Sequence, residues 1–170
     1  MPVRLPAFAL LLLMPLALFA GVSAQELPKP AGKIILTISG KISQKNAGDS
    51  AVFDRAALES IGKHVLLTTT NWTDGVKRFE GVLMRDLLAR VGASGVVVSA
   101  TALNDYTVDI PVSDFQRYDV LLAFSMDGKD LQPSDKGPLW IVYPRDRHPE
   151  LNNAQHEARW IWQLRTLTVR

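Results

Sequence analysis

The chain contains no cysteine among its 170 residues. This absence excludes disulfide bonds, thiolate ligands for a metal and a cysteine nucleophile. Familiar catalytic motifs are missing as well: the sequence has no phosphate-binding glycine loop, no Gly-x-Ser-x-Gly element and no His-Glu-x-x-His pair. A Ser-His-Asp site built from residues far apart in the sequence is still an alternative, although no residue pattern indicates one. The sequence therefore offers no recognisable catalytic centre of its own.

The first 24 residues have the layout of a secretory signal peptide. A single positive charge, Arg4, precedes an apolar run from Leu5 to Val22, and small residues lie at the expected cleavage site after Ala24. As a helix, residues 7–20 would span only about 21 Å, against roughly 30 Å of hydrocarbon, so a cleaved signal is favoured over an anchor helix. We expect a periplasmic or secreted protein.

Two absences in this first segment refine the expected export route. No Arg-Arg pair precedes the apolar run, so transport in a folded state is not signalled. No cysteine follows the run, which excludes a lipid anchor on such a residue. We expect export as an unfolded chain and no stable membrane insertion after cleavage.

Charge gives the mature chain no long-range preference for polyanions. Cleavage after residue 24 of 170 leaves 146 residues, and the loss of Arg4 lowers the 19 basic side chains to 18, against 17 acidic ones, for a net charge of +1. A balance this even does not attract nucleic acid or anionic membranes. The size matches one domain, so we predict an extended leader over residues 25–32 and a single domain over residues 33–170.

Hydrophobic spacing within the domain predicts short helices scattered among many strands. Apolar residues at helical spacing, closed by Gly62 and Gly92, predict helices over residues 53–61 and 83–91. Weaker patterns predict short helices over residues 112–118 and 154–162. The expected strands cover residues 33–38, 64–70, 96–100, 106–110, 120–126, 139–143 and 164–169. This order lacks regular βαβ alternation and predicts an α+β domain with a mixed sheet.

Basic and aromatic side chains in the last third of the chain are the candidates for binding. Arg145, Arg147 and His148 have the donors to hold an anion, and Arg159 and Lys136 are candidates to lie beside them. A solvated loop is the simpler interpretation. A zinc site on the histidines of this region is less favoured than ordinary surface histidines, because a proline and a loop intervene.

Four tryptophans carry most of the aromatic surface of the domain. Trp140 lies in an apolar strand and should belong to the core. Trp160 and Trp162 are two residues apart, so on a helix at most one of them would point inward. The other would cap a groove or lie on the surface.

A series of short motifs resembles the molybdopterin-binding domain of the sulfite oxidase family. The motifs run in order from about residue 65 to the end of the chain. They are Phe79-Glu80-Gly81-Val82-Leu83 with Asp86-Leu87-Leu88, Asn104-Asp105-Tyr106, Leu121-Leu122-Ala123 with Asp127-Gly128, Gly137-Pro138-Leu139, Tyr143-Pro144, Arg159-Trp160 and Thr168-Val169. The resemblance implies the sulfite-oxidase-type fold, with mixed sheet and short helices.

The resemblance also implies where a molybdenum ligand would lie. In that family a cysteine after the strand that precedes the Gly-Val-x-Leu segment binds the metal, and the equivalent position here is near Thr68. A threonine hydroxyl cannot supply the soft anionic ligand that a thiolate provides. The family's cofactor is inserted in the cytoplasm, and export of an unfolded chain would leave it behind. We expect no cofactor, with molybdopterin as the alternative.

These observations predict a binding module in place of a working molybdoenzyme. A cleft between the Asn71-Trp72 turn, Tyr106 and the loop from Arg145 to His148 would receive a small anionic ligand or a segment of an envelope protein partner. One alternative is a molybdopterin-dependent oxidoreductase that holds its cofactor without a covalent bond. A purely structural accessory protein of an envelope complex is the other, so whether the chain is an enzyme stays open.

Overall fold

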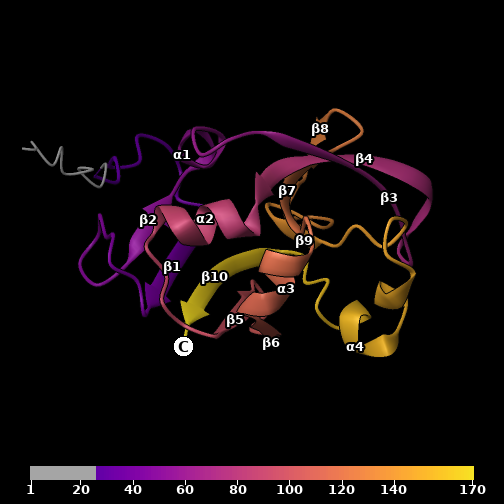
Figure 1. The fold of residues 1–170 in the computed structure, drawn as a ribbon. Helices are drawn as coiled ribbons and strands as arrows, with labels where there is room; N and C mark the ends of the chain where they lie inside the picture. Colours follow the sequence, from indigo (N-terminus) through magenta and orange to yellow (C-terminus); the bar gives the residue numbers. More distant parts are fainter. Residues whose placement is uncertain (1–25) are drawn as a thin grey trace, which may run out of the picture.

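The computed structural model describes residues 26–170, which form two β-sheets with short helices (Figure 1). The expected signal segment and its cleavage site lie outside the described residues. Within residues 26–170, the helices are all too short to cross a bilayer.

The first sheet is mixed and contains both ends of the described domain. Its strand order is β2-β1-β10-β5-β6, with β1 and β10 parallel and every other neighbouring pair antiparallel. In β1, β5 and β10 one face is buried and the other is partly exposed, as their alternating burial shows. The strands are β1 (Leu36–Gly40), β2 (Ala51–Phe53), β5 (Val97–Ala102), β6 (Thr107–Pro111) and β10 (Leu164–Val169).

The second sheet is antiparallel and carries the longest strand. Its order is β3-β4-β7-β8, and β9 also pairs with β7. The strands are β3 (His64–Thr70), β4 (Thr73–Leu83), β7 (Leu121–Met126), β8 (Lys129–Asp130) and β9 (Trp140–Val142). Strands β7 and β9 are buried almost throughout, which explains their continuous apolar sequences.

Short helices link the strands. They are α1 (Arg55–Glu59), α2 (Met84–Arg90), α3 (Val112–Arg117), the 3₁₀ turn η1 (Pro149–Leu151) and α4 (Ala154–Glu157). Helix α2 packs on β4 and α3. Its buried side chains, Met84, Leu87 and Leu88, join a hydrophobic core that includes residues of both sheets. The chain is therefore an α+β domain, as its sequence predicts, although the strands form two sheets.

Several predicted elements are confirmed. The strand over residues 64–70 coincides with β3, and the predicted pair over residues 96–100 and 106–110 forms the antiparallel pair β5 and β6. Asp127-Gly128 forms the tight turn between β7 and β8, with both residues at positive φ. The final strand is present as β10.

Other predicted boundaries are wrong for local reasons. Phe53 belongs to β2 and not to a helix, because Asp54 has an extended backbone and is the N-cap of α1, so the helix starts only at Arg55. Strand β4 (Thr73–Leu83) is absent from the predicted strands, and only Asn71 and Trp72 join it to β3. The predicted helix over residues 154–162 is one turn long and ends at Glu157, so the helical argument about Trp160 and Trp162 does not apply.

Asp54 ties the leader to the domain. One carboxylate oxygen accepts from the backbone N–H of Ala57 at 2.8 Å and caps α1, while the other accepts from the N–H groups of Ala31 and Gly32 at 2.9 and 2.7 Å. These bonds, chiefly the one from Ala57, hold the pKa of Asp54 below its ordinary value of 3.8. Leu27 is also buried, so the leader packs on the domain and is no free extension.

Replacement of Asp54 by Ala should lower the midpoint of urea unfolding at neutral pH, because three backbone donors lose their acceptor. A carboxyl group with a depressed folded-state pKa stabilises the fold above its unfolded pKa and loses that contribution as the pH falls through the folded value. The difference between the variant and the parent protein should therefore shrink below about pH 4. Asp49→Ala, which removes an exposed carboxylate, is the control, and an equal loss at all pH values would contradict this role.

Candidate functional site

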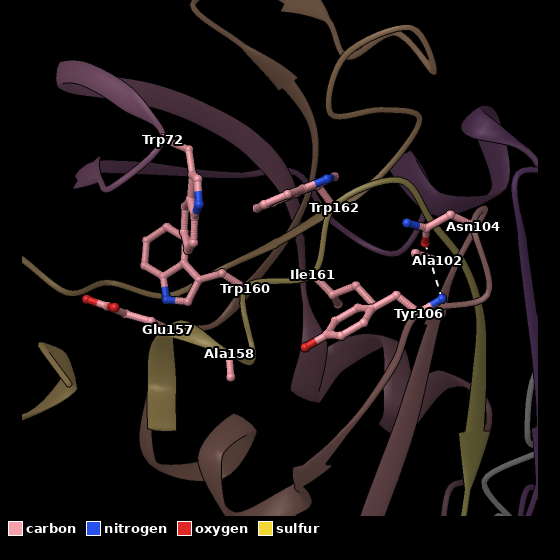
Figure 2. A pocket seen from close by; sticks show the side chains of 9 residues that line it. All are labelled: Trp72, Ala102, Asn104, Tyr106, Glu157, Ala158, Trp160, Ile161 and Trp162. Atoms are coloured by element: carbon pink, nitrogen blue, oxygen red, sulfur yellow. Dashed lines mark hydrogen bonds between the residues drawn. The ribbon is translucent and has the colours of Figure 1, made fainter. Parts of the chain in front are cut away.

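An aromatic pocket opens between three connections of the fold (Figure 2). It has a volume of about 330 Å³, at the lower end of the range for small-molecule sites. The β3–β4 turn, the β5–β6 turn and the segment after α4 surround it. The lining residues are Trp72, Ala102, Asn104, Tyr106, Glu157, Ala158, Trp160, Ile161 and Trp162.

Trp72 reaches the pocket from the two-residue turn between β3 and β4. The turn is held by Thr70, whose hydroxyl contacts the Thr73 hydroxyl at 2.8 Å and accepts from the Trp72 N–H at 3.0 Å. Both threonine side chains therefore have partners within the turn. This local bonding fixes the backbone of Trp72 so that its ring is directed at the other tryptophans.

The tryptophan rings meet at steep angles. The Trp72 centroid lies 5.2 Å from that of Trp162 at an interplanar angle of 69°, and 5.7 Å from that of Trp160 at 49°. Trp140 lies behind these rings, with its centroid 6.2–6.3 Å from each of the three, and is fully buried. The prediction that Trp140 belongs to the core is confirmed. The remaining rings form a corner whose faces point in different directions.

Tyr106 forms the opposite wall. It follows a tight turn in which Asp105 has a φ of 66°, and its N–H donates to the Asn104 side chain at 3.2 Å. In Figure 2 the Tyr106 hydroxyl points toward Ala158 and Trp160. About half of the Tyr106 side chain is exposed, so this wall borders solvent.

Glu157 is the one charged side chain among the lining residues. Its Oε1 accepts from Asn71 Nδ2 at 2.6 Å, and Asn71 in turn accepts from Arg145. In Figure 2 the carboxylate lies beside the Trp160 ring, on the side away from Tyr106. The formal charge of the lining is therefore −1.

The structure brings together only part of the predicted site. Trp72 and Tyr106 line the pocket, and Asn71 borders it through Glu157. Arg145 contacts Asn71 behind the rim but does not line the cavity. The loop that carries Arg145 is tied to β3 by Asp146, which accepts from the Thr69 N–H and hydroxyl at 2.7 and 2.6 Å.

The other basic candidates lie elsewhere. Arg147 lines a separate cavity of about 120 Å³, next to Arg85 and Asp119. His148 packs on the Tyr118 ring, 5.0 Å between centroids, and faces Glu150. The basic residues that the sequence predicted to form one anion site therefore lie in separate places in the structure.

Arg159 is buried in an ion pair. It donates to Asp114 Oδ2 at 2.6 Å, and the Tyr143 hydroxyl donates to the same oxygen at 2.9 Å. Burial, together with the Asp114 charge, raises the pKa of Tyr143 above its ordinary value and keeps the phenol neutral as a donor. Arg159 thus anchors the segment that carries Ala158 and Trp160.

The residues at the expected metal position do not fit molybdenum. The Thr68 side chain is fully buried, and its hydroxyl donates to the Thr69 carbonyl at 3.4 Å. Residues 26–170 contain no group of three or more histidine, aspartate or glutamate side chains able to hold a metal ion. A hard, neutral hydroxyl that faces the core supplies neither the charge nor the access that such a metal needs.

Sequence reasoning missed the role of the last residue of α4 and of the segment that follows it. Glu157, Ala158 and Ile161 line the pocket together with both tryptophans, since the chain from residue 158 to 163 is not helical. The available signal was the Trp-x-Trp spacing, which suits an extended chain that packs on other aromatic rings. Asn104 was part of the resemblance but was not assigned to the site.

Comparisons with known proteins agree on the fold. The model of a family described as the oxidoreductase molybdopterin binding domain matches residues 53–162. Among solved structures, the chain is similar to the sulfane dehydrogenase SoxCD from Paracoccus pantotrophus, with a TM-score of 0.59 and 19% identity. That alignment covers 79% of this chain and 37% of the SoxCD chain, so this chain spans little more than a third of its length. A search of curated proteins found no match.

Replacement of Arg159 by Met should destabilise the domain strongly. The side chains of Arg159 and Asp114 are only 10% and 11% exposed, and loss of one partner leaves a buried charge uncompensated. Such a loss costs about 3–5 kcal/mol. Urea unfolding measures the change, with Arg165→Met as the control, because its exposed pair with Asp105 contributes less than about 1 kcal/mol. Equal effects of the two substitutions would refute the anchoring role.

Proposed function

We propose that this chain, which belongs to the family of oxidoreductase molybdopterin-binding domains, is an exported protein that binds a ligand or partner. We further propose that it has no cysteine-ligated molybdenum centre.

The observation that carries the proposal is the residue at the metal-ligand position. The family resemblance puts the ligand near Thr68, where the side chain is buried and hydrogen bonded within the backbone of β3. With no cysteine in the sequence, no other side chain supplies a thiolate. A molybdenum centre of the family's usual kind would therefore have no thiolate ligand in this chain.

The aromatic pocket supports the binding role. It is preformed by elements that pack on the core, and it combines apolar walls with polar groups from Asn104, Tyr106 and Glu157. This combination is typical of small-molecule sites. A bound ligand or a short partner segment would cover Trp72 and Trp162, which are half-buried in the free domain.

Export is supported by the first 24 residues of the sequence. An apolar run after Arg4 and small residues before Gln25 are typical of a signal for the general secretory route. We propose a periplasmic or secreted location for the mature chain. The activity of SoxCD is not carried over, because this chain covers only 37% of that chain at 19% identity.

Protein purified from its native compartment should contain far less than one molybdenum atom per chain. Inductively coupled plasma mass spectrometry measures the metal, and native mass spectrometry should give the mass of the polypeptide alone. A molybdenum enzyme of the same family that has its cysteine, purified in parallel, controls for cofactor loss. Near-stoichiometric molybdenum with a pterin mass would overturn the proposal.

The exported protein should begin at Gln25. N-terminal sequencing of the secreted or periplasmic form measures this directly, and Ala24→Tyr, which places a bulky residue at the cleavage site, should slow processing. An intact Met1 on the exported chain would contradict a cleaved signal.

A further inference from the structure

We propose that the aromatic pocket binds a quaternary ammonium group, with the indole faces as walls and Glu157 as the counter-charge. The inference rests on the proposed function, because it names the ligand class of the same pocket. It follows from the angles between the rings, from the charge of the lining and from the positions of the nearby cations.

The angles between the rings favour a compact ligand over a flat one. A flat aromatic ligand is best held between two parallel faces, yet Trp72 meets Trp162 at 69° and Trp160 at 49°. The nearly parallel pair formed by Tyr143 and Trp160, at 26°, involves a fully buried tyrosine outside the pocket. Because Trp160 is almost fully buried, the aromatic surface open to a rounded group comes from the partly exposed Trp72 and Trp162 and from Tyr106.

The charge of the lining favours a cation. The faces of indole and phenol rings are electronegative and attract a cation within about 6 Å of the ring centroid, with tryptophan the strongest. Glu157 adds a negative charge at the rim, and no lysine, arginine or histidine lines the cavity. An anion would find neutral donors on Asn104 and Tyr106 but no positively charged side chain in the lining, and it would be repelled by the carboxylate of Glu157.

The positive side chains near the pocket already have other partners. Arg159 follows Ala158 in the sequence but is turned away into its ion pair with Asp114. Arg145 donates to Asn71 and reaches Glu157 only through that amide. The Lys136 ammonium lies 5.8 Å from the Trp140 ring centroid, so the same tryptophan cluster holds an internal cation outside the pocket.

A primary amine suits the pocket less well than a methylated one. A lysine-like ammonium needs hydrogen-bond acceptors for its three donors, and the carboxylate beside Trp160 is at the rim. A quaternary ammonium group has no donors and gains from contact with Trp72, Trp162 and Tyr106. Aromatic cages of this kind recognise choline-like groups in general.

The experiment compares choline with its neutral carbon isostere, 3,3-dimethylbutan-1-ol, by isothermal titration calorimetry and tryptophan fluorescence at constant ionic strength. Choline should bind about tenfold or more tightly than the isostere, which corresponds to roughly 1.4 kcal/mol of cation–π and carboxylate attraction. Equal affinity for both compounds, preferential binding of inorganic phosphate, or no binding of choline would each overturn the inference.

Matched variants locate the binding. Glu157→Gln should weaken choline binding several-fold and leave the isostere unchanged, and Tyr106→Leu, at an exposed position, should weaken both. Glu59→Gln, a glutamate on α1 paired with Arg55, is the control and should change neither. An unchanged choline affinity in Glu157→Gln and Tyr106→Leu would place the cation elsewhere and refute the assignment.

Two further measurements separate the possible outcomes. Co-flotation with phosphatidylcholine vesicles, but not with phosphatidylglycerol vesicles, would identify a lipid headgroup as the source, while binding of free choline without flotation would identify a soluble ligand. Both support the inference. Molybdenum content is measured on the same sample: a loaded metal centre refutes the proposed function, whereas a metal-free protein that ignores choline refutes only the ligand class.

Discussion

The contact of Trp72 with the other tryptophans determines how the pocket is built. Trp140 lies on β9 of the second sheet, whereas Trp160 and Trp162 lie on the connection that leads into β10 of the first sheet. Trp72, at the tip of β3 and β4, packs against all three rings. Large aromatic surfaces gain most from such burial, so the turn, the connection and the sheet are held in one arrangement.

This arrangement places the aromatic pocket beside the hairpin on which the family resemblance would put a metal ligand. Thr68 and Trp72 lie on the same hairpin, four residues apart, but their side chains have different surroundings: Thr68 is enclosed by the core and Trp72 borders the open pocket. Although this hairpin has no thiol, the connections of the family fold still surround a concave site. Loops of this kind commonly carry ligand-binding residues, whereas thiolate ligation of a metal needs a cysteine, which this chain lacks.

Most elements of the fold could be predicted from the sequence because their signals are local. Strand β3 and the pair β5–β6 follow from β-branched residues and alternation, and Asp127-Gly128 identifies its own turn. Strand β4 was missed because its polar first half, from Thr73 to Arg78, is stabilised by pairing with β3 and not by its own apolar residues. Propensity alone cannot detect a strand whose support lies in a partner.

The site was predictable only in part, for the same reason. Trp72 and Tyr106 are noticeable as large aromatic residues next to turns, and both line the pocket. The positions of Arg159 and Glu157 depend on contacts with Asp114 and Asn71, each more than 40 residues away in the chain. A row of basic residues in the sequence therefore resembled one anion site, whereas the fold separates its members.

The buried pair between Arg159 and Asp114 has a consequence for the thermodynamics of recognition. Arg159 sits between Ala158 and Trp160, so the wall that these residues form is immobilised when the domain folds. The conformational entropy of this wall is lost during folding and need not be lost again when a ligand enters. A small ligand of the proposed class, with few contacts, would then meet a wall that is already ordered.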